Sequence, residues 1–405
     1  MGLLKTITEE YLGGLEYVQE IHRDTSLLGT GSDILALTGP RRVGKTFTLL
    51  KHVSSLLKAG QSAIYAAFDD PSLVSLSVRD FAEMVRADYP SGSVSLFLDE
   101  IQEWENWDQK VRWLHDVKDF QIYISGSSSD LLSSEIPSKL RGRYVSRTIL
   151  PFSFSEVCGT NAQQTFRETG KLRRCLDEYL RWGGFPEVWM LRSREKIVSI
   201  LDTMFYRDIV ERHGVTDIMQ FREAFHFILK NYSNPLTWNS MRKMMHLSGL
   251  DLDTKTVIRY VNSIASSYLI FLNYRFSFSQ REMSVSPKKI YLVDPGIATV
   301  YAATPDVGRR IENLVYLQLL RMGGSVNYYT TRDGKEIDFI YSEGRERKLV
   351  EVCVQADSDH VGRVRRALSE SGAQSALILT LEDNLLQEGR ICVMPIHRWL
   401  AVPGL

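Results

Sequence analysis

The feature that most constrains the fold of this chain is an eight-residue stretch, GPRRVGKT, at positions 39–46. The apolar run ILALT (34–38) precedes it, and the amphipathic segment FTLLKHVSSLLKAG (47–60) follows it. A short apolar run ended by glycine is typical of a buried strand, and the apolar spacing after Thr46 predicts a helix. The stretch therefore joins a buried strand directly to the start of a helix.

Three more apolar runs continue this alternation of strands and helices: SAIYAAF (62–68), VSLFLDE (94–100) and QIYISGS (121–127). Segments with helical patterns separate them, which is typical of a parallel sheet with crossover helices. Because the runs are apolar on both faces, we expect helices on both sides of the sheet. The sequence thus predicts an α/β domain over residues 1–155.

The stretch at 39–46 satisfies the pattern G-x-x-x-x-G-K-[ST] of a P-loop in full. Its glycines allow turns that point successive backbone N–H groups at phosphate oxygens, and the following helix adds its positive end. Lys45 would neutralise the β- and γ-phosphates, and Thr46 would bind Mg²⁺ through its hydroxyl. A glycine turn that binds nothing is the alternative. The predicted cofactors are ATP and Mg²⁺, and the predicted nucleotide-binding residues are Gly39, Pro40, Arg41, Arg42, Val43, Gly44, Lys45, Thr46 and Phe47.

An acidic pair, Asp99 and Glu100, ends the run VSLFLDE. A nucleotide site needs a carboxylate on the metal side, and Asp99 would hold Mg²⁺ there. Glu100 would polarise the attacking water as a general base. The alternative is a strand that ends in a solvated acidic pair.

Two further candidates for catalysis follow, Ser127 and Arg143. A polar side chain at Ser127 could sense the γ-phosphate, although serines here could also cap a helix, as Ser129 would before DLL. Arg143 could act as an arginine finger, often supplied in trans by a neighbouring subunit. Surface ion pairing is its alternative role.

Taken in order along the chain, several segments resemble the AAA+-type ATPases of archaea and bacteria that carry a C-terminal domain of unknown function. The matching segments are GPRRVGKT, LFLDEIQ, ISGSSSDLL, LRGRYVSRTILPFSFSE, YLRWGGFPEV, YRDIVERHGV, YLVDPGI, IENLVYLQLLR, GKEIDFIYS and KLVEVCV. The resemblance implies a P-loop core with a helical lid, ATP hydrolysis and a homo-oligomer, with a hexameric ring as one arrangement. It also implies that Lys45, Thr46, Asp99, Glu100, Ser127 and Arg143 form the ATPase site.

After the lid (156–234), residues 235–280 predict a winged helix. Residues 237–276 read as two short helices, a turn at SGLDLD, a third helix and the hairpin-like SSYLIFLNYRFSF. The third helix would present cations to DNA, and the candidate DNA contacts are Arg242, Lys243, Lys255 and Arg259. A packing module with a solvated basic face is the alternative.

Residues 281–405 resemble the α/β core of restriction-endonuclease-like, PD-(D/E)xK nucleases. The resemblance places Glu312, Asp338 and Glu351 at the acidic positions, where three oxygen ligands could hold Mg²⁺. Cys353 stands where that family has its lysine, and a thiol cannot stabilise the attacking hydroxide as an ammonium does. We therefore expect a degenerate domain that binds DNA or partners. A basic helix at 359–370 could contact nucleic acid or only solvent.

Composition limits the remaining choices. Lys plus Arg and Asp plus Glu each total 49, so no global field attracts nucleic acid or lipid, and any such binding must be local. The four cysteines lack a C-x-x-C pair, which predicts neither a zinc knuckle nor a disulfide framework and favours a reducing cytoplasm. No apolar run is long enough to span a membrane. Three functions stay open: an oligomeric ATPase that acts on DNA, a nucleotide-gated switch that controls a protein partner, and an ATP-regulated nuclease.

Overall fold

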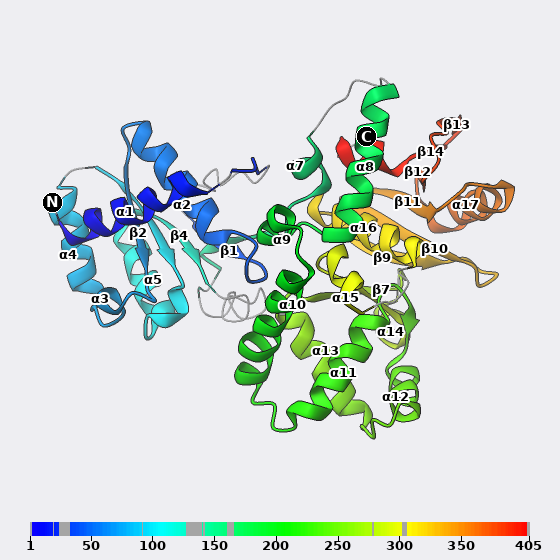
Figure 1. Ribbon diagram of the computed structural model, residues 1–405, viewed down its shortest axis with the longest axis horizontal. Coiled ribbons are helices and arrows are strands. Elements are labelled where there is room, and N and C mark those ends of the chain that lie inside the picture. Colours follow the sequence, from blue (N-terminus) through cyan, green and yellow to red (C-terminus); the bar gives the residue numbers. More distant parts are fainter. Residues whose placement is uncertain are drawn as a thin grey trace. The chain divides into compact units, whose positions relative to one another are not determined.

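In the computed structural model, the protein divides into two compact units, Met1–Leu150 and Pro151–Leu405 (Figure 1). Each unit has its own sheets and its own apolar core. The finer division into domains at 155, 234 and 280 stays a prediction. The structure describes residues 2–18, 20–23, 33–90, 92–126, 140, 142–159, 166–277, 279–301 and 306–402.

The N-terminal unit is built on a five-stranded parallel sheet in the order β2-β3-β4-β1-β5. Its strands are β1 (Ile34–Thr38), β2 (Ser62–Ala67), β3 (Val94–Asp99), β4 (Phe120–Ser125) and β5 (Tyr144–Thr148). The four strands predicted from apolar runs are confirmed. Sequence reasoning missed β5 because this edge strand is half-exposed and polar, so it contains no apolar run.

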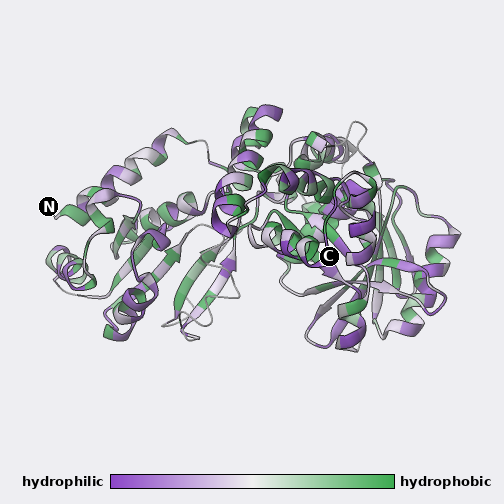
Figure 2. Cartoon of the chain, turned by 90° about the horizontal axis from the view of Figure 1, so that it is seen from below, coloured by the Kyte–Doolittle hydropathy of each residue, from purple (hydrophilic) through white to green (hydrophobic). Residues whose placement is uncertain are grey.

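Helices pack against this sheet, and most present a buried apolar side to it. They are α1 (Leu3–Gly13), α2 (Lys45–Lys58), α3 (Pro71–Val74), α4 (Val78–Asp88) and α5 (Trp107–Val117), with the 3₁₀ turns η1 (Gly14–Tyr17) and η2 (Ile101–Glu103). In α2, Leu49, Leu50 and Val53 are buried, as the predicted amphipathic pattern requires. Figure 2 shows that the strands are mainly hydrophobic (green), whereas the helices combine hydrophobic (green) and hydrophilic (purple) residues.

The C-terminal unit begins with a helical part that comprises α7 (Phe154–Cys158), α8 (Phe166–Trp182), α9 (Pro186–Leu191), α10 (Arg194–Thr203), the π-helix η3 (Met204–Glu211) and α11 (Ile218–Lys230). A disulfide links Cys158 of α7 to Cys175 of α8, with 6.0 Å between the Cα atoms. The expectation of no disulfide was therefore wrong. The two residues are 17 positions apart, and only the packing of α7 against α8 brings them together. The cysteines therefore do not support the prediction of a reducing compartment.

Three segments that are distant in the sequence meet in one buried junction of the C-terminal unit: the loop before α7, the turn between α8 and α9, and the start of η4 (Pro295–Ile297). The Asp294 carboxylate accepts N–H bonds from Gly184 (2.6 Å) and Gly296 (2.8 Å), and Phe152 N–H donates to the Gly184 carbonyl at 2.7 Å. Gly183 has a φ of +74°, and a Cβ there would lie 1.6 Å from Asp294 Oδ1. Glycine at positions 183 and 184 thus allows the close packing of these three chain segments.

A small antiparallel sheet follows, in the order β6-β8-β7. Its elements are β6 (Pro235–Leu236), α12 (Trp238–Leu247), α13 (Thr254–Ser266), β7 (Ile270–Tyr274), α14 (Gln280–Val285) and β8 (Lys288–Leu292). One helix, α12, precedes the turn SGLDLD where two were predicted. The predicted hairpin was also wrong, because its segment holds only β7. The partner of β7 is β8, and α14 lies between them in the sequence.

The last part of the chain forms a six-stranded mixed sheet in the order β13-β14-β12-β11-β10-β9. Its elements are α15 (Ala298–Tyr301), α16 (Val307–Arg321), β9 (Ser325–Thr330), β10 (Glu336–Glu343), β11 (Glu346–Cys353), α17 (Ser358–Ser371), β12 (Ser375–Thr380), β13 (Leu386–Glu388), β14 (Ile391–Pro395) and α18 (Ile396–Ala401). The basic helix predicted at 359–370 is confirmed as α17, whereas β13, β14 and α18 were missed. In the described part of the chain, none of the helices has the length and apolar character needed to cross a bilayer.

Candidate active site

The loop at 39–46 has the backbone that its glycines predict. Gly39 and Gly44 have φ values of +130° and +90°, and Arg42 is left-handed as well at +62°. A Cβ on Gly39 would lie 2.1 Å from the carbonyl oxygen of Ile149, the residue after β5. Glycine is therefore required there for close packing as well as for the turn.

The loop leads into the N-terminus of α2, where no described side chain caps the helix. Its N-cap is Gly44, so the first N–H groups are left to bind an anion. Lys45 Nζ donates to the carbonyls of Gly39 and Pro40, each at 2.9 Å. The Lys45 ammonium is thus held against the inside of the loop, in the position that phosphate oxygens would share.

Asp99, at the carboxyl end of β3, is the centre of the site. It is only 2% exposed and accepts hydrogen bonds from Thr46 Oγ1 (2.6 Å), Tyr65 OH (2.8 Å), the Glu100 N–H (3.0 Å) and Ser125 Oγ. These donors come from the loop helix and the ends of three neighbouring strands. The Thr46 hydroxyl and the Asp99 carboxylate are the hard oxygen ligands that Mg²⁺ prefers, so this pair fits the predicted metal.

Glu100 follows in a left-handed conformation, with a φ of +45°. Because of this turn, the Glu100 side chain does not follow the in-and-out alternation of β3. Gln102 Nε2 donates to Glu100 Oε2 at 2.6 Å. Burial raises the pKa of Glu100, and Asp99 adds to this, while Gln102, Lys45 and Arg41 act in the opposite direction. The side chain therefore lies within electrostatic reach of the loop cations.

Four residues of this site were missed from the sequence: Arg23, Tyr65, Gln102 and Ser125. Arg23 donates to the Leu150 carbonyl at 2.9 Å and to the Val43 carbonyl of the loop. Tyr65 stays a hydroxyl donor, because burial and the adjacent Asp99 raise its pKa. Ser125 could have been found, since it ends β4 in the same run as the predicted Ser127. Gln102 could also have been found, because it lies two residues after Glu100 in the segment LFLDEIQ. Arg23 and Tyr65 carry no local pattern.

A cavity of about 340 Å³ lies beside the first turns of α2. It is lined by Glu20, Ile21, His22, Arg23, Phe47, Thr48, Lys51, His52 and Ser55. Phe47, which sequence reasoning assigned to nucleotide binding, lies in its wall, and Arg23 connects the cavity to the loop. The cavity can hold a group larger than phosphate next to the phosphate-binding loop.

Comparisons with known proteins agree with this geometry. Residues 31–158 match a family model described as an AAA domain. An uncharacterized protein of Methanocaldococcus jannaschii is 30% identical over 379 residues, which cover 90% of this chain and 85% of the relative. The chain belongs to this family of AAA-type P-loop proteins. The predicted family resemblance is thereby confirmed.

Other comparisons extend over the rest of this AAA protein. Residues 173–306 match a domain of unknown function, DUF8612, and residues 307–399 match another, DUF4143. An uncharacterized protein of Haemophilus influenzae is 27% identical over 333 residues, covering 80% of this chain and 82% of that one. A Walker-type ATPase of Pyrococcus abyssi is similar in structure with a TM-score of 0.42 and 15% identity, over 72% of this chain and 95% of that one.

The two remaining catalytic candidates of the AAA domain are Ser127 and Arg143. Ser127 lies outside the described residues. Arg143 donates to both carboxylate oxygens of Asp116, at 2.7 and 2.9 Å, on the surface. Its carbonyl accepts from Ile34 N–H, so it lies at the amino end of β1, about 16 Å of strand from the loop. Arg143 therefore cannot reach the nucleotide site of its own chain.

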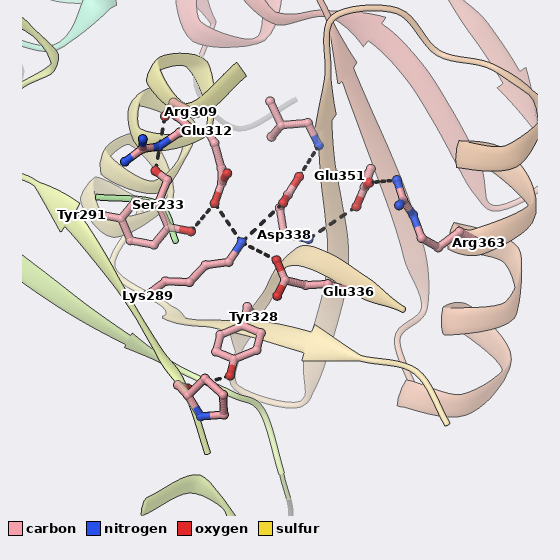
Figure 3. Close-up of polar contacts among 12 residues, drawn as sticks. Ser233, Lys289, Tyr291, Arg309, Glu312, Tyr328, Glu336, Asp338, Glu351 and Arg363 are labelled. Carbon is pink, nitrogen blue, oxygen red and sulfur yellow. Dashed lines mark hydrogen bonds and ion pairs between the residues drawn. The ribbon is translucent and has the colours of Figure 1, made fainter. Parts of the chain in front are cut away.

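Three candidate nuclease residues of the AAA protein, Glu312, Asp338 and Glu351, lie in one largely buried network (Figure 3). Glu312 of α16 and Asp338 of β10 both face Lys289 of β8, and Glu336 joins them. Glu351 of β11 pairs instead with Arg363 of α17. Among the described residues, no group of three or more acidic, His or Cys side chains has a metal-binding arrangement.

The ionisation of this network follows from its burial. Burial raises the pKa of Glu312 to about 7, with Asp338 adding to the effect and Lys289 opposing it. Burial likewise raises the pKa of Cys353 to about 12, so its thiol is neutral at physiological pH. Cys353 therefore cannot supply the charge of the lysine that it replaces.

The candidate DNA contacts lie on α12 and α13. Lys243, Lys255 and Arg259 are exposed, and Arg242 is half-buried. On α13, Val257, Val261 and Ile264 are buried on the opposite side. The helix therefore presents a cationic face to solvent, and its role with DNA stays a prediction.

Proposed function

We propose that this AAA protein binds ATP together with Mg²⁺ and hydrolyses the γ-phosphate. The observation that carries the proposal is the convergence on Asp99: the Thr46 hydroxyl at 2.6 Å, next to the Lys45 ammonium in its loop and the Glu100 carboxylate. A metal-side carboxylate, a phosphate-binding cation and a general base are the parts that phosphoryl transfer to water needs.

Each residue has a distinct task in this proposal. The loop N–H groups and Lys45 bind the phosphates, and the cavity beside Phe47 holds the nucleoside. Thr46 and Asp99 would hold Mg²⁺, which when bound neutralises phosphate charge. Glu100 accepts a proton from the attacking water, and Gln102 sets the direction of its carboxylate.

The direct test measures ATP binding and phosphate release by the purified full-length chain. We expect phosphate release with Mg²⁺ and none when EDTA removes it. Protein that neither retains ATP nor releases phosphate in the presence of Mg²⁺ would overturn the proposal.

We further propose that the chain acts as a homo-oligomer, with a hexameric ring as one arrangement. The position of Arg143 supports this, because only a neighbouring subunit's nucleotide could be within its reach. Arg143→Ala should keep ATP affinity and slow turnover. Unchanged turnover would contradict the assignment of Arg143 as an arginine finger.

Coupling of hydrolysis to DNA is the favoured use of the energy. The order α11, β6, α12, α13, β7, α14, β8 with a β6-β8-β7 sheet supports a winged helix in which α14 lies between the last two strands, and α13 carries exposed Lys255 and Arg259. The order α16-β9-β10-β11-α17-β12 supports the proposal that this part is a restriction-endonuclease-like core. We assign it to binding, because Cys353 replaces the lysine that cleavage needs.

This DNA role predicts that duplex or junction DNA stimulates ATP turnover at low salt, and that the stimulation disappears as salt rises. The double substitution Lys255→Glu and Arg259→Glu should reduce the stimulation by DNA at least about 10-fold, because it reverses two charges that would face phosphates. Lys58→Glu, at the end of α2 in the other unit, is the matched control. Turnover that is indifferent to DNA would favour a nucleotide-gated switch acting on a protein partner.

A further inference from the structure

The acidic cluster of the C-terminal unit already contains a cation. Lys289 of β8 is 2% exposed in its side chain, and its Nζ lies 2.9 Å from Glu312 Oε1, 2.6 Å from Glu336 Oε1 and 3.6 Å from Asp338 Oδ1. Figure 3 shows these three carboxylates converging on the ammonium from α16 and β10. Glu312 and Glu336 lie within hydrogen-bond distance of the ammonium, and Asp338 adds an ion pair at 3.6 Å.

Several carboxylates of the cluster have further protein partners. Glu312 Oε1 accepts from Tyr291 OH at 2.6 Å, and Asp338 Oδ2 accepts from the Val352 N–H at 2.9 Å. Glu351 accepts from the Asp338 N–H at 3.4 Å and is paired with Arg363. The two acids of β10 and β11 are thus bound to backbone donors and to a second cation.

The distances in this cluster suit an ammonium better than a metal. Oxygen ligands lie about 2.0–2.1 Å from Mg²⁺ and about 2.3–2.6 Å from Ca²⁺. The carboxylate oxygens here are 2.6–3.6 Å from the Lys289 nitrogen. A divalent ion would have to displace a covalently tethered cation and draw the oxygens inward.

We propose that the Lys289 ammonium is the built-in cation of this cluster, standing where a divalent ion would bind, so that the C-terminal domain holds no metal. The cluster then has a structural task. Lys289 belongs to the β6-β8-β7 sheet, whereas its partners belong to α16 and the six-stranded sheet. The buried ion pairs fasten these two parts of the C-terminal unit to each other.

A catalytic lysine is the competing role for Lys289. Such a lysine must offer a donor or its charge to a phosphate or a hydroxide. Lys289 is buried, and three carboxylates of its own chain, two of them at hydrogen-bond distance, already compensate its charge. This competing role becomes an outcome of the experiment below.

The test counts Mn²⁺ ions bound by the full-length chain, from the electron paramagnetic resonance signal of free Mn²⁺. All variants carry Lys45→Ala and are measured without nucleotide, so that they share the same background at the P-loop. Lys289→Ala is expected to bind one more Mn²⁺ per chain than its parent, and its melting temperature should rise with Mn²⁺. Adding Asp338→Asn should remove the extra ion.

Lys288→Ala is the matched control. Lys288 is the preceding buried residue of β8, but its Nζ donates to the Ser286 carbonyl at 3.0 Å and lies over the Trp238 ring. This variant loses a buried lysine without opening the acidic cluster. It should gain no Mn²⁺ ion.

Four results would overturn the proposal. The parent could already bind an ion that Asp338→Asn alone removes, or a folded Lys289→Ala variant could gain no ion. The Lys289→Ala variant could fail to fold even when it is refolded with Mn²⁺, or the native chain could cleave DNA in a reaction that Lys289→Ala abolishes. Recovery of the variant only in Mn²⁺ would support the proposal, because the metal then replaces the lost ammonium.

Discussion

Glu100→Gln is expected to retain ATP and to lose at least about 100-fold in kcat, the typical contribution of a general base. The substitution keeps the shape of the side chain and a contact with Gln102, but it removes the proton acceptor. Binding should change little, because the phosphates are held by the loop and by Lys45. The measurements are ATP affinity by fluorescent-nucleotide titration and phosphate release at saturating ATP and Mg²⁺.

Lys45→Ala is the contrasting variant. It removes the ammonium from the loop, so ATP affinity and turnover should fall together. If Glu100→Gln instead turned over ATP at the native rate, another residue would have to serve as the base. If it lost ATP affinity as well, Glu100 would be a binding residue.

The pH dependence of kcat gives an independent readout for Glu100. Burial raises the pKa of its carboxyl, and only the ionised form can accept a proton from water. Activity should therefore fall as pH drops through this raised pKa, at a higher pH than an exposed glutamate would give. The acid limb of the profile should disappear in Glu100→Gln.

Gly184→Ala is expected to destabilise the C-terminal unit by about 3 kcal/mol or more, at the upper end of overpacking effects. The new Cβ would lie 2.1 Å from the carbonyl oxygen of Phe152 and 2.9 Å from its nitrogen. Both are backbone atoms with partners of their own: Phe152 N–H donates to the Gly184 carbonyl, and the Phe152 carbonyl accepts from Tyr179 OH, so neither can move away cheaply. Urea unfolding followed by tryptophan fluorescence measures the effect.

Gly170→Ala is the matched control for this prediction. Gly170 is an exposed residue of α8, and a Cβ there meets no atom within 4 Å. Alanine should leave stability unchanged or raise it by up to about 1 kcal/mol, the difference in helix propensity. Equal effects of the two substitutions would mean that the junction around Asp294 does not hold the unit together.

The nucleotide site could be predicted from the sequence to the extent that its parts follow strands in one local pattern. The loop at 39–46 and the pair Asp99 and Glu100 each stand at the end of an apolar run, and parallel strands bring such ends to one edge. Tyr65 and Arg23 could not be predicted in the same way. Their roles depend on which strand lies beside which, and the order β2-β3-β4-β1-β5 is a property of the folded sheet.

The C-terminal cluster shows the same limit more sharply. Sequence reasoning found Glu312, Asp338 and Glu351 and noted that a lysine was missing near Cys353. It could not find Lys289, which comes from a strand of a different sheet and reaches the cluster only after the two sheets pack. The disulfide between Cys158 and Cys175 was missed for a related reason, since helix packing and not spacing joins them.

The sequence by itself determined the local matters: where the buried strands and amphipathic helices lie, where glycine must turn the backbone, and which strand ends carry phosphate-binding and acidic groups. These follow from periodicity and from the conformational limits of single residues, which neighbours in the chain already specify. The tertiary structure decided which donors surround Asp99, at which end of the sheet Arg143 lies, and which cation enters the acidic cluster. Such pairings join residues far apart in the chain, and they depend on long-range packing that no short stretch of sequence encodes.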